Sequence, residues 1–272
     1  DVQLAGCDEA LEEAARFLGL RCGALDPDAA PAGFQQQPRV ALQAGFNADL
    51  IAENADGASA DTSTSHSFDA PNSGGNNVMY SVGFRGPKNP GAPPPFGLPA
   101  DGRIDSSQNP GVAYQLAPYG GNNALLLVAQ NETRTLTLQT SGAYEKIILL
   151  ASSAEGQSTF DVTLLYSDGT SSDVAFIVPD WYGGAGYATQ GIGRVTRNAQ
   201  FLPPNNWPFD QDGAFSGDAG NPRLYDCILD NAAHRTQILT AIQVKKTSAG
   251  GRTAILAAAG QKNAGAPAAP VV

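Results

Sequence analysis

The sequence lacks any apolar run long enough to cross a membrane as a helix. The longest runs, 124–129 and 147–151, have the length of buried β-strands. The chain begins with Asp1 and not with Met, which we interpret as the result either of signal-peptide removal or of trimming of the chain. These features together predict a secreted protein, extracellular or at the cell surface.

Charge is also scarce, since Asp, Glu, Lys and Arg make up 15% of the 272 residues. The formal net charge is −10, and a negative field repels both phosphate backbones and anionic lipid surfaces. The composition therefore argues against nucleic acid as a partner and against membrane insertion. It favours divalent cations, because hard cations prefer carboxylate and carbonyl oxygen.

Cysteine occurs three times, at Cys7, Cys22 and Cys227, with no spacing that suits a zinc site. A disulfide between Cys7 and Cys22 would close a loop of about 15 residues and contribute roughly 3 kcal/mol. Cys227 lies in an apolar strand pattern and would then be a buried thiol. The alternative is that Cys227 pairs with one of the other two cysteines.

The sequence predicts three regions: an N-terminal helical segment and linker over 1–37, a β-sandwich domain over 38–260, and an Ala/Pro-rich tail over 261–272. A helix is expected over 8–20, because apolar residues recur there at helical spacing after an acidic first turn. The tail is expected to be disordered or an interdomain linker.

Strand-like patterns dominate the middle region. They occupy 40–42, 78–82, 112–116, 124–129, 133–139, 144–151, 158–166, 173–178, 224–230, 237–246 and 252–258. Asp168-Gly169 predicts a type I′ hairpin turn, and the uneven pattern of 237–246 predicts a bulge. Regular strands joined by short turns indicate an antiparallel β-sandwich and not βαβ units.

Nucleophilic catalysis finds little support in the sequence. The two histidines, His66 and His234, fall in expected loops or strand edges, and no G-x-S-x-G nucleophile elbow is present. Paired carboxylates for glycoside hydrolysis could come only from acidic residues in expected loops, where solvation or metal binding is the simpler interpretation. A hydrolase with an unrecognised site is thus the third functional hypothesis.

A calcium loop is possible at Asp210, Asp212 and Asp218, where two carboxylates lie two residues apart and Gly213 follows. This resembles the start of an EF-hand loop, but the later acidic positions and the terminal Glu are missing. The two interpretations are a structural calcium ion and an ordinary solvated turn.

Carbohydrate binding has the largest set of candidates, since sugars are held by aromatic rings and planar polar side chains. The candidate ligand-binding residues are Asp180, Trp181, Tyr182, Tyr187, Arg194, Trp207, Asn122 and Asn123, with Tyr119 as a further loop aromatic. The alternative is that Trp181 and Tyr182 cap the core at the end of the sandwich. Arg223 is expected either to serve a ligand or to pair with Asp180 or Asp226, and the ion pair is the favoured interpretation.

Several short motifs together carry a family resemblance. They are Gly45-Phe-Asn-Ala-Asp49, Tyr119-Gly-Gly-Asn-Asn-Ala-Leu125, Asp180-Trp-Tyr-Gly-Gly184, Gly191-Ile-Gly-Arg-Val195 and Asn221-Pro-Arg-Leu-Tyr225. As a set over 40–261 they resemble β-sandwich modules of large secreted bacterial surface proteins, of the galactose-binding-like, jelly-roll kind. The resemblance implies an accessory or surface role and carries over no catalytic residue.

The sequence therefore predicts a mainly β protein, an antiparallel jelly-roll sandwich with a short N-terminal helix. The favoured function is non-catalytic binding of a glycan or cell-surface polymer through the Trp181–Tyr182 loop. The alternative is a structural subunit of an extracellular filament or surface layer, with copies of itself as partners.

Overall fold

The protein is described by a computed structural model that covers residues 39–40, 42–53, 66–69, 77–84, 96–196, 215–216 and 218–263. The chain divides into two compact units, Asp1–Gln35 and Gln36–Val272, and all described residues belong to the second. The predicted helix over 8–20, the Cys7–Cys22 disulfide, Trp207, Asp210 and Asp212 lie outside the described residues. No helix in the described part has the length and apolar character needed to span a membrane.

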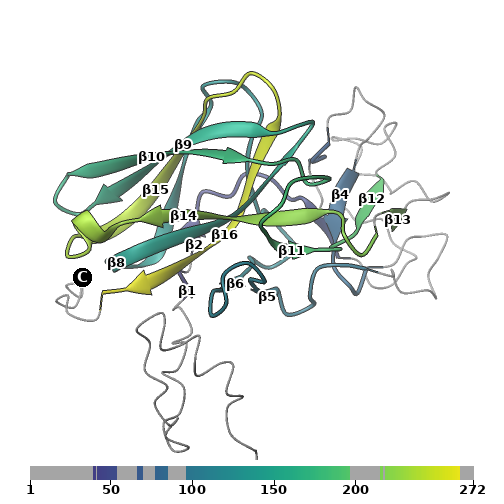
Figure 1. Cartoon of the computed structure of the whole chain (residues 1–272), viewed down its shortest axis with the longest axis horizontal. Coiled ribbons are helices and arrows are strands. Elements are labelled where there is room, and N and C mark those ends of the chain that lie inside the picture. Colours follow the sequence, from purple (N-terminus) through teal and green to yellow (C-terminus); the bar gives the residue numbers. More distant parts are fainter. Residues whose placement is uncertain are drawn as a thin grey trace, which may run out of the picture. The chain divides into compact units, whose positions relative to one another are not determined.

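The described part is almost entirely β-structure (Figure 1). The strands before the long central one are β1 (Arg39–Val40), β2 (Leu42–Ala44), β3 (Ile51–Ala52), β4 (Asn77–Tyr80), β5 (Arg103–Asp105), β6 (Ala113–Gln115) and β7 (Leu125–Leu127). Then follow β8 (Thr133–Ala154), β9 (Ser158–Tyr166), β10 (Ser171–Val178), β11 (Tyr187–Gln190), β12 (Arg194–Thr196), β13 (Phe215–Ser216), β14 (Arg223–Asp230), the 3-10 turn η3 (Ala232–His234), β15 (Ile238–Lys246) and β16 (Arg252–Lys262).

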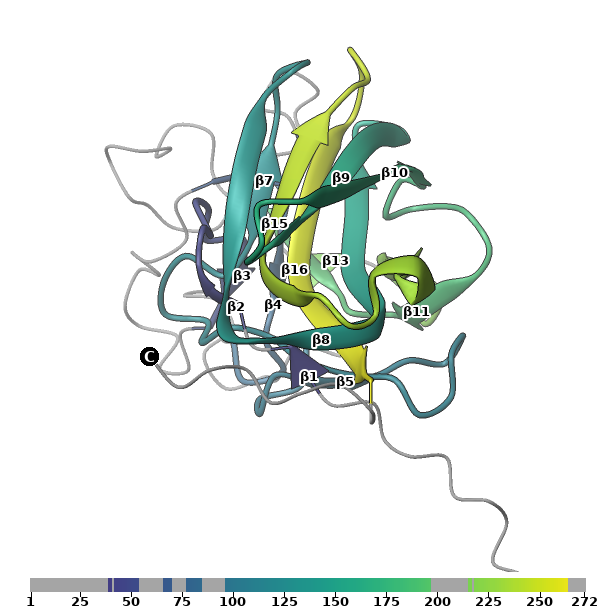
Figure 2. The ribbon, with the colours of Figure 1, turned by 90° about the vertical axis from the view of Figure 1, so that its left-hand side faces the viewer.

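Strand β8 holds the two layers of the sandwich together. Its first half pairs with β15, which continues through β9 to the edge strand β10, and its second half pairs with β14 on one side and β16 on the other. The strand bends between these halves, as Figure 2 shows. The layers face each other across a core in which Leu136, Phe160 and Val162 share one apolar cluster with Leu149 and Cys227.

The second half of β8 is buried on both faces. Leu149 faces the core between the layers, whereas Ile148 and Leu150 pack into a second apolar cluster with Tyr114 and Trp181. A strand covered on both sides needs apolar residues at successive positions, and this explains the continuous run over 147–151. The prediction of a buried strand there is confirmed.

The strand predictions are wrong where a bend within a strand has the amino-acid composition of a loop. The segments 133–139 and 144–151 were predicted as two strands, yet they form the single strand β8. Gln139-Thr-Ser-Gly142 has turn-like composition, but here it carries the chain from one layer to the other. Strand β16 runs to Lys262, so residues 261–262 belong to the sheet and not to the predicted tail.

The local turn chemistry is partly as predicted. The bulge in β15 is confirmed between Leu239 and Ala241. The hairpin at Asp168-Gly169 is present, but only Gly169 has a positive φ, 83°. The type I′ prediction is therefore wrong, because that turn requires positive φ at both central residues. The Asp168 carboxylate instead accepts hydrogen bonds from the backbone and side chain of Thr170.

Two glycines with positive φ lie in turns with different packing: Gly156 between β8 and β9, and Gly251 just before β16. A Cβ on Gly251 (φ 69°) would lie 2.7 Å from the Gln157 carbonyl oxygen, whereas a Cβ on Gly156 (φ 95°) meets nothing within 4 Å. Gly156→Ala should cost about 1 kcal/mol in unfolding free energy from backbone strain alone. Gly251→Ala should cost at least about 1 kcal/mol more, because neighbouring backbone must move. Equal losses in urea unfolding would contradict this packing.

Candidate ligand-binding site

The loop after β10 is fixed to the end of β8. The Trp181 backbone N–H donates to the Ser153 carbonyl at 2.7 Å, and the Ser153 N–H donates to the Pro179 carbonyl at 3.1 Å. The Asp180 carboxylate accepts the Tyr182 N–H at 2.8 Å and the Gly156 N–H at 2.7 Å. Both oxygens of Asp180 thus shape the loop, and we assign the side chain a structural role there.

Trp181 is part of the core. Its side chain is 1% exposed, and its ring meets Phe68 edge-to-face at 5.0 Å between centroids. A ring so buried offers no face to a sugar, so Trp181 cannot stack on a sugar in this structure. The core-capping alternative describes its position. The indole Nε1–H donates to Asp69 at 3.0 Å.

Asp69 joins several side chains that the sequence placed far apart. It is 8% exposed, and its Oδ2 accepts a hydrogen bond from Asn77 Nδ2 of β4 at 2.8 Å. The Arg194 guanidinium of β12 lies 3.5 Å from the same oxygen. On its other side Arg194 lies over the Tyr182 ring, 4.2 Å from the ring centroid. We call Asp69, Asn77, Tyr182 and Arg194 the Asp69 cluster.

The electrostatics of the Asp69 cluster are set by burial. Desolvation raises the pKa of Asp69 above its usual value, against the opposing effects of the Asn77 hydrogen bond and the Arg194 charge. Glu155 adds a smaller upward effect. Burial also lowers the pKa of Arg252, which the charges of Glu155 and Asp69 partly offset. The Asn77 and Arg194 contacts therefore offset only part of the desolvation of the Asp69 carboxylate.

A second aromatic–guanidinium pair contacts the same loop at Gly184. The Arg223 guanidinium of β14 is 5.1 Å from the Tyr187 ring centroid. Its Nε donates to the Gly220 carbonyl at 2.6 Å, and its NH1 donates to the Gly184 carbonyl. The predicted ion pair of Arg223 with Asp180 or Asp226 is wrong, because backbone carbonyls take the donors.

The two predicted asparagines have different positions. Asn122 is exposed and donates to the Phe46 carbonyl at 3.3 Å. Asn123 is fully buried: its amide donates to Asp49 at 2.6 Å and accepts from the Leu50 N–H at 2.9 Å. Asn123 therefore ties two loops together within the core, and a ligand could not reach it in this conformation.

The remaining predictions concern metals and thiols. Asp218 caps the Gly220 N–H at 2.6 Å, and within the described ranges no group of three or more His, Cys, Asp or Glu residues could hold a metal ion. The calcium loop has its other two members outside the described residues, so it stays a prediction. Cys227 is a free buried thiol, and burial raises its pKa to about 12.

The sequence pointed to Trp181, Tyr182 and Arg194, and the structure brings all three to Asp69. It missed Asp69 itself, which sits in a Ser/Thr-rich stretch typical of a solvated loop. One signal was available: Ser67-Phe68-Asp69 places a large apolar residue inside that polar stretch. Phe68 is fully buried, and Asp69, the next residue, is therefore buried beside it.

Comparisons with known proteins give limited guidance. No family model and no curated protein matches the chain. Among solved structures, the catalytic domain of a GH87 alpha-1,3-glucanase in complex with nigerose is similar at 19% identity and a TM-score of 0.30, covering 54% of this chain and 23% of that one. The agarase AgWH50C is similar at 9% identity and a TM-score of 0.26, covering 54% of this chain and 21% of that one. Such scores are too low to assign a fold family.

The raised pKa of Asp69 predicts a definite pH dependence. The folded state holds the Asp69 proton more tightly than the unfolded chain, so ionisation of Asp69 destabilises the fold as pH rises above 3.8. The unfolding free energy of the native chain minus that of Asp69→Asn should therefore fall with rising pH from that value. Urea unfolding of both proteins between about pH 3 and pH 7 measures it. A difference that grows with pH would contradict the assignment.

Proposed function

We propose that the chain is an extracellular, non-catalytic carbohydrate-binding module with a jelly-roll sandwich of the galactose-binding-like kind. The observation that carries the proposal is the convergence of Asp69, Tyr182 and Arg194 at one end of the sandwich. The two antiparallel layers joined by β8 support the proposed fold. A structural calcium ion at Asp210, Asp212 and Asp218 belongs to the same proposal.

The chemistry of the Asp69 cluster suits sugar hydroxyls. A guanidinium presents several N–H donors in one plane, so Arg194 can bind adjacent sugar hydroxyls. Asp69 is buried and already accepts hydrogen bonds from Trp181 and Asn77, so its part is to hold the Arg194 guanidinium in place. The Arg194 side chain is 27% exposed, which leaves it reachable from solvent. The Tyr182 ring holds the guanidinium flat, so little side-chain entropy is lost when a ligand binds.

We expect Arg194→Lys to weaken glycan binding roughly tenfold, equivalent to about 1.4 kcal/mol. Lysine keeps the charge but loses the planar fork and the stacked contact with Tyr182. The measurement is isothermal titration with the best ligand from a glycan array. Tyr182→Ala should have a similar effect, whereas Tyr182→Phe, which keeps the ring, should have little.

The matched control is Arg103→Lys, since Arg103 is an exposed arginine paired with the exposed Asp105 at 2.6 Å. It should leave affinity unchanged. Trp181→Ala is unsuitable as a binding test, because removing a buried ring of this size costs about 3–5 kcal/mol in stability. Native affinity in Arg194→Lys, or no binding to any glycan by the native chain, would sink the proposal.

A second candidate function is that of a structural subunit in an extracellular assembly, and the edge strand β10 favours it. Strand β10 pairs with β9 over eight residues without a register shift, and contains no Pro, Lys or Arg. Its Ile177 is 66% exposed. Charged residues also protect an edge strand, and β10 has one of them, Asp173, so its edge is only lightly protected against pairing with another chain.

If copies associate through β10, the native chain should show concentration-dependent association in sedimentation velocity, and Ile177→Lys should abolish it. A charge on the edge strand opposes strand pairing between copies. Val128→Lys is the control, because Val128 is another exposed aliphatic residue, just after β7. A strictly monomeric native chain at every concentration would exclude this function.

A further inference from the structure

A groove of about 200 Å³ lies on the sheet face beside the 106–112 loop. It is separate from the Asp69 cluster, with which it shares no lining residue. Its lining residues come from the loop and from three adjacent strands: Asn109, Pro110, Val112, Lys146, Ile148, Ile228 and Gln261. We refer to these residues as the β14 groove.

The floor of the β14 groove is apolar. Ile148 of β8 and Ile228 of β14 are register partners, and Val112 lies against them. Ile228 is 43% exposed, whereas Val112 and Ile148 are 6% and 4% exposed, so Ile228 supplies most of the accessible apolar surface of the floor. The floor can therefore bury the C–H face of a small ring.

The loop wall of the groove is held in place by one carboxylate. Asp226 of β14 accepts hydrogen bonds from Ser106 Oγ at 2.6 Å, from Asn109 Nδ2 at 2.6 Å and from the Tyr114 hydroxyl. Three donors on one carboxylate fix the loop against the sheet. The wall is thus formed before a ligand arrives, and a ligand need not order it.

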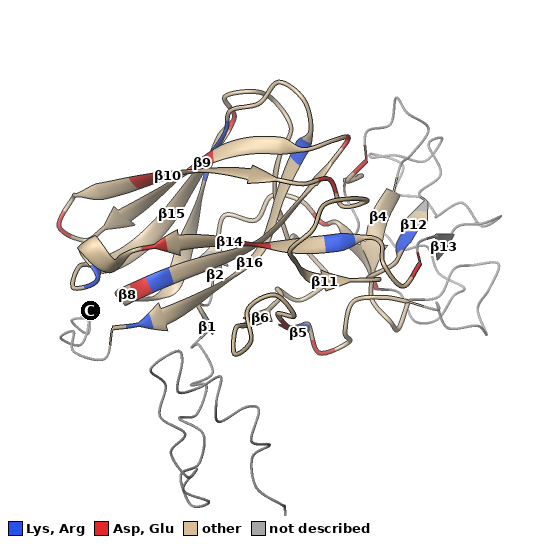
Figure 3. Cartoon of the chain, in the orientation of Figure 1, with Lys and Arg blue, Asp and Glu red and all other residues tan. Residues whose placement is uncertain are grey.

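The groove contains one cation. Lys146 is exposed and makes no ion pair within 4.0 Å among the described residues. Its register partner Asp230 uses its carboxylate to accept the Ala232 N–H at 3.0 Å. Lys146 lies in the second half of β8, and Figure 3 shows that blue segments, which mark Lys and Arg, are few in the described part of the chain. The chain has a net charge of −10, but within the groove the unpaired Lys146 ammonium beside the apolar floor attracts a ligand that carries a negative group.

We propose that the β14 groove binds a sugar residue that carries a carboxylate, such as a uronic acid in an acidic polysaccharide. The ring lies on Ile148 and Ile228, and its carboxylate reaches the Lys146 ammonium. Gln261 and Asn109 line the groove and supply polar groups for its hydroxyls. The proposal rests on the proposed function only in that the ligand is a glycan, and its site is independent.

The test is affinity electrophoresis in native gels that contain either polygalacturonate or neutral dextran. The native chain should be retarded by polygalacturonate, and Lys146→Gln should raise the apparent Kd at least fivefold, as should Ile228→Asp. Lys245→Gln is the control, because Lys245 is an exposed lysine on β15 of the other layer. The overall negative charge opposes non-specific adsorption to a polyanion, so retardation reports a local site.

Each outcome decides between the sites. Loss of retardation in Lys146→Gln but not in Lys245→Gln or Arg194→Lys supports the groove. Retention of native retardation in Lys146→Gln overturns it, as does equal loss in both lysine variants. A native chain that binds a neutral glycan but not polygalacturonate overturns the groove and leaves the proposed function standing, whereas binding to neither polymer nor any arrayed glycan removes both.

Discussion

The double burial of the second half of β8 is the constraint on which the rest of the structure depends. Its odd-numbered side chains, such as Leu149, fill the core between the two layers, and its even-numbered ones, such as Ile148, fill the core beneath the loops. Each loop that covers the outer face is therefore packed against the same strand that closes the sandwich. A polar substitution at either face would leave a buried group without a partner and would loosen both cores.

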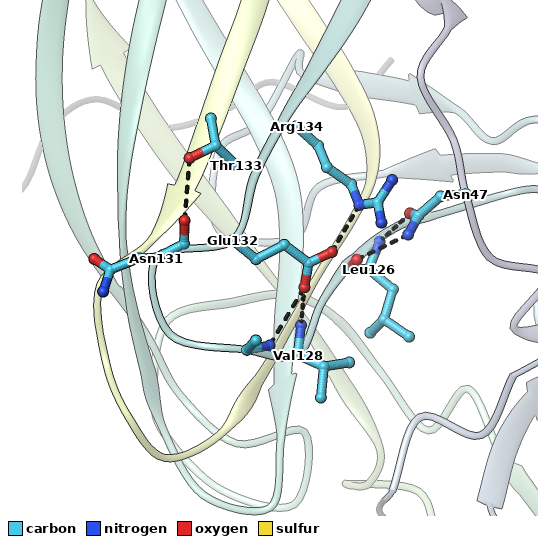
Figure 4. Close-up of polar contacts among 8 residues, drawn as sticks. Asn47, Leu126, Val128, Asn131, Glu132, Thr133 and Arg134 are labelled. Atoms are coloured by element: carbon cyan, nitrogen blue, oxygen red, sulfur yellow. Dashed lines mark hydrogen bonds and ion pairs between the residues drawn. The ribbon is translucent and has the colours of Figure 1, made fainter.

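The loops that carry polar chemistry are attached to this strand and its neighbours by backbone hydrogen bonds. Ser153 near the end of β8 receives the loop at Trp181, and Asp226 on the adjacent β14 receives the loop at Asn109. The Asp69 cluster and the β14 groove thus occupy different parts of one rigid frame. The turn between β7 and β8 is also fixed by a carboxylate. Glu132 accepts the N–H groups of Val128 and Ala129 and pairs with Arg134 at 2.8 Å (Figure 4). These contacts outweigh the effect of burial, so the pKa of Glu132 is lowered.

The sequence predicted those parts of the fold that periodicity controls. Strand β9 alternates between buried and half-buried positions as its sequence does, and the run over 147–151 is buried as predicted. It could not predict the bend in β8, because a bend and a loop use the same Gly, Ser and Thr residues. It also could not separate a binding tryptophan from a core tryptophan. Trp181 is next to solvent-facing loop residues in sequence, but it is buried against Phe68 and Asp69, which lie more than 100 residues earlier in the chain.

Two buried ionic groups, Lys246 and Asp69, show how the fold places charge in its interior. Where few charges are available, those placed in the interior must be matched by donors or acceptors, since an uncompensated buried charge is costly. Lys246 is fully buried, and its ammonium donates to the Ser248 carbonyl at 2.5 Å and the Gly250 carbonyl at 2.9 Å, which ties the turn before β16. Asp69 differs because its pKa is raised, so its donors do not fully replace the water it has lost. The contacts of Asp69 with Trp181, Asn77 and Arg194 therefore offset part of its desolvation, and the loss of any one of them would leave the buried carboxylate less well compensated.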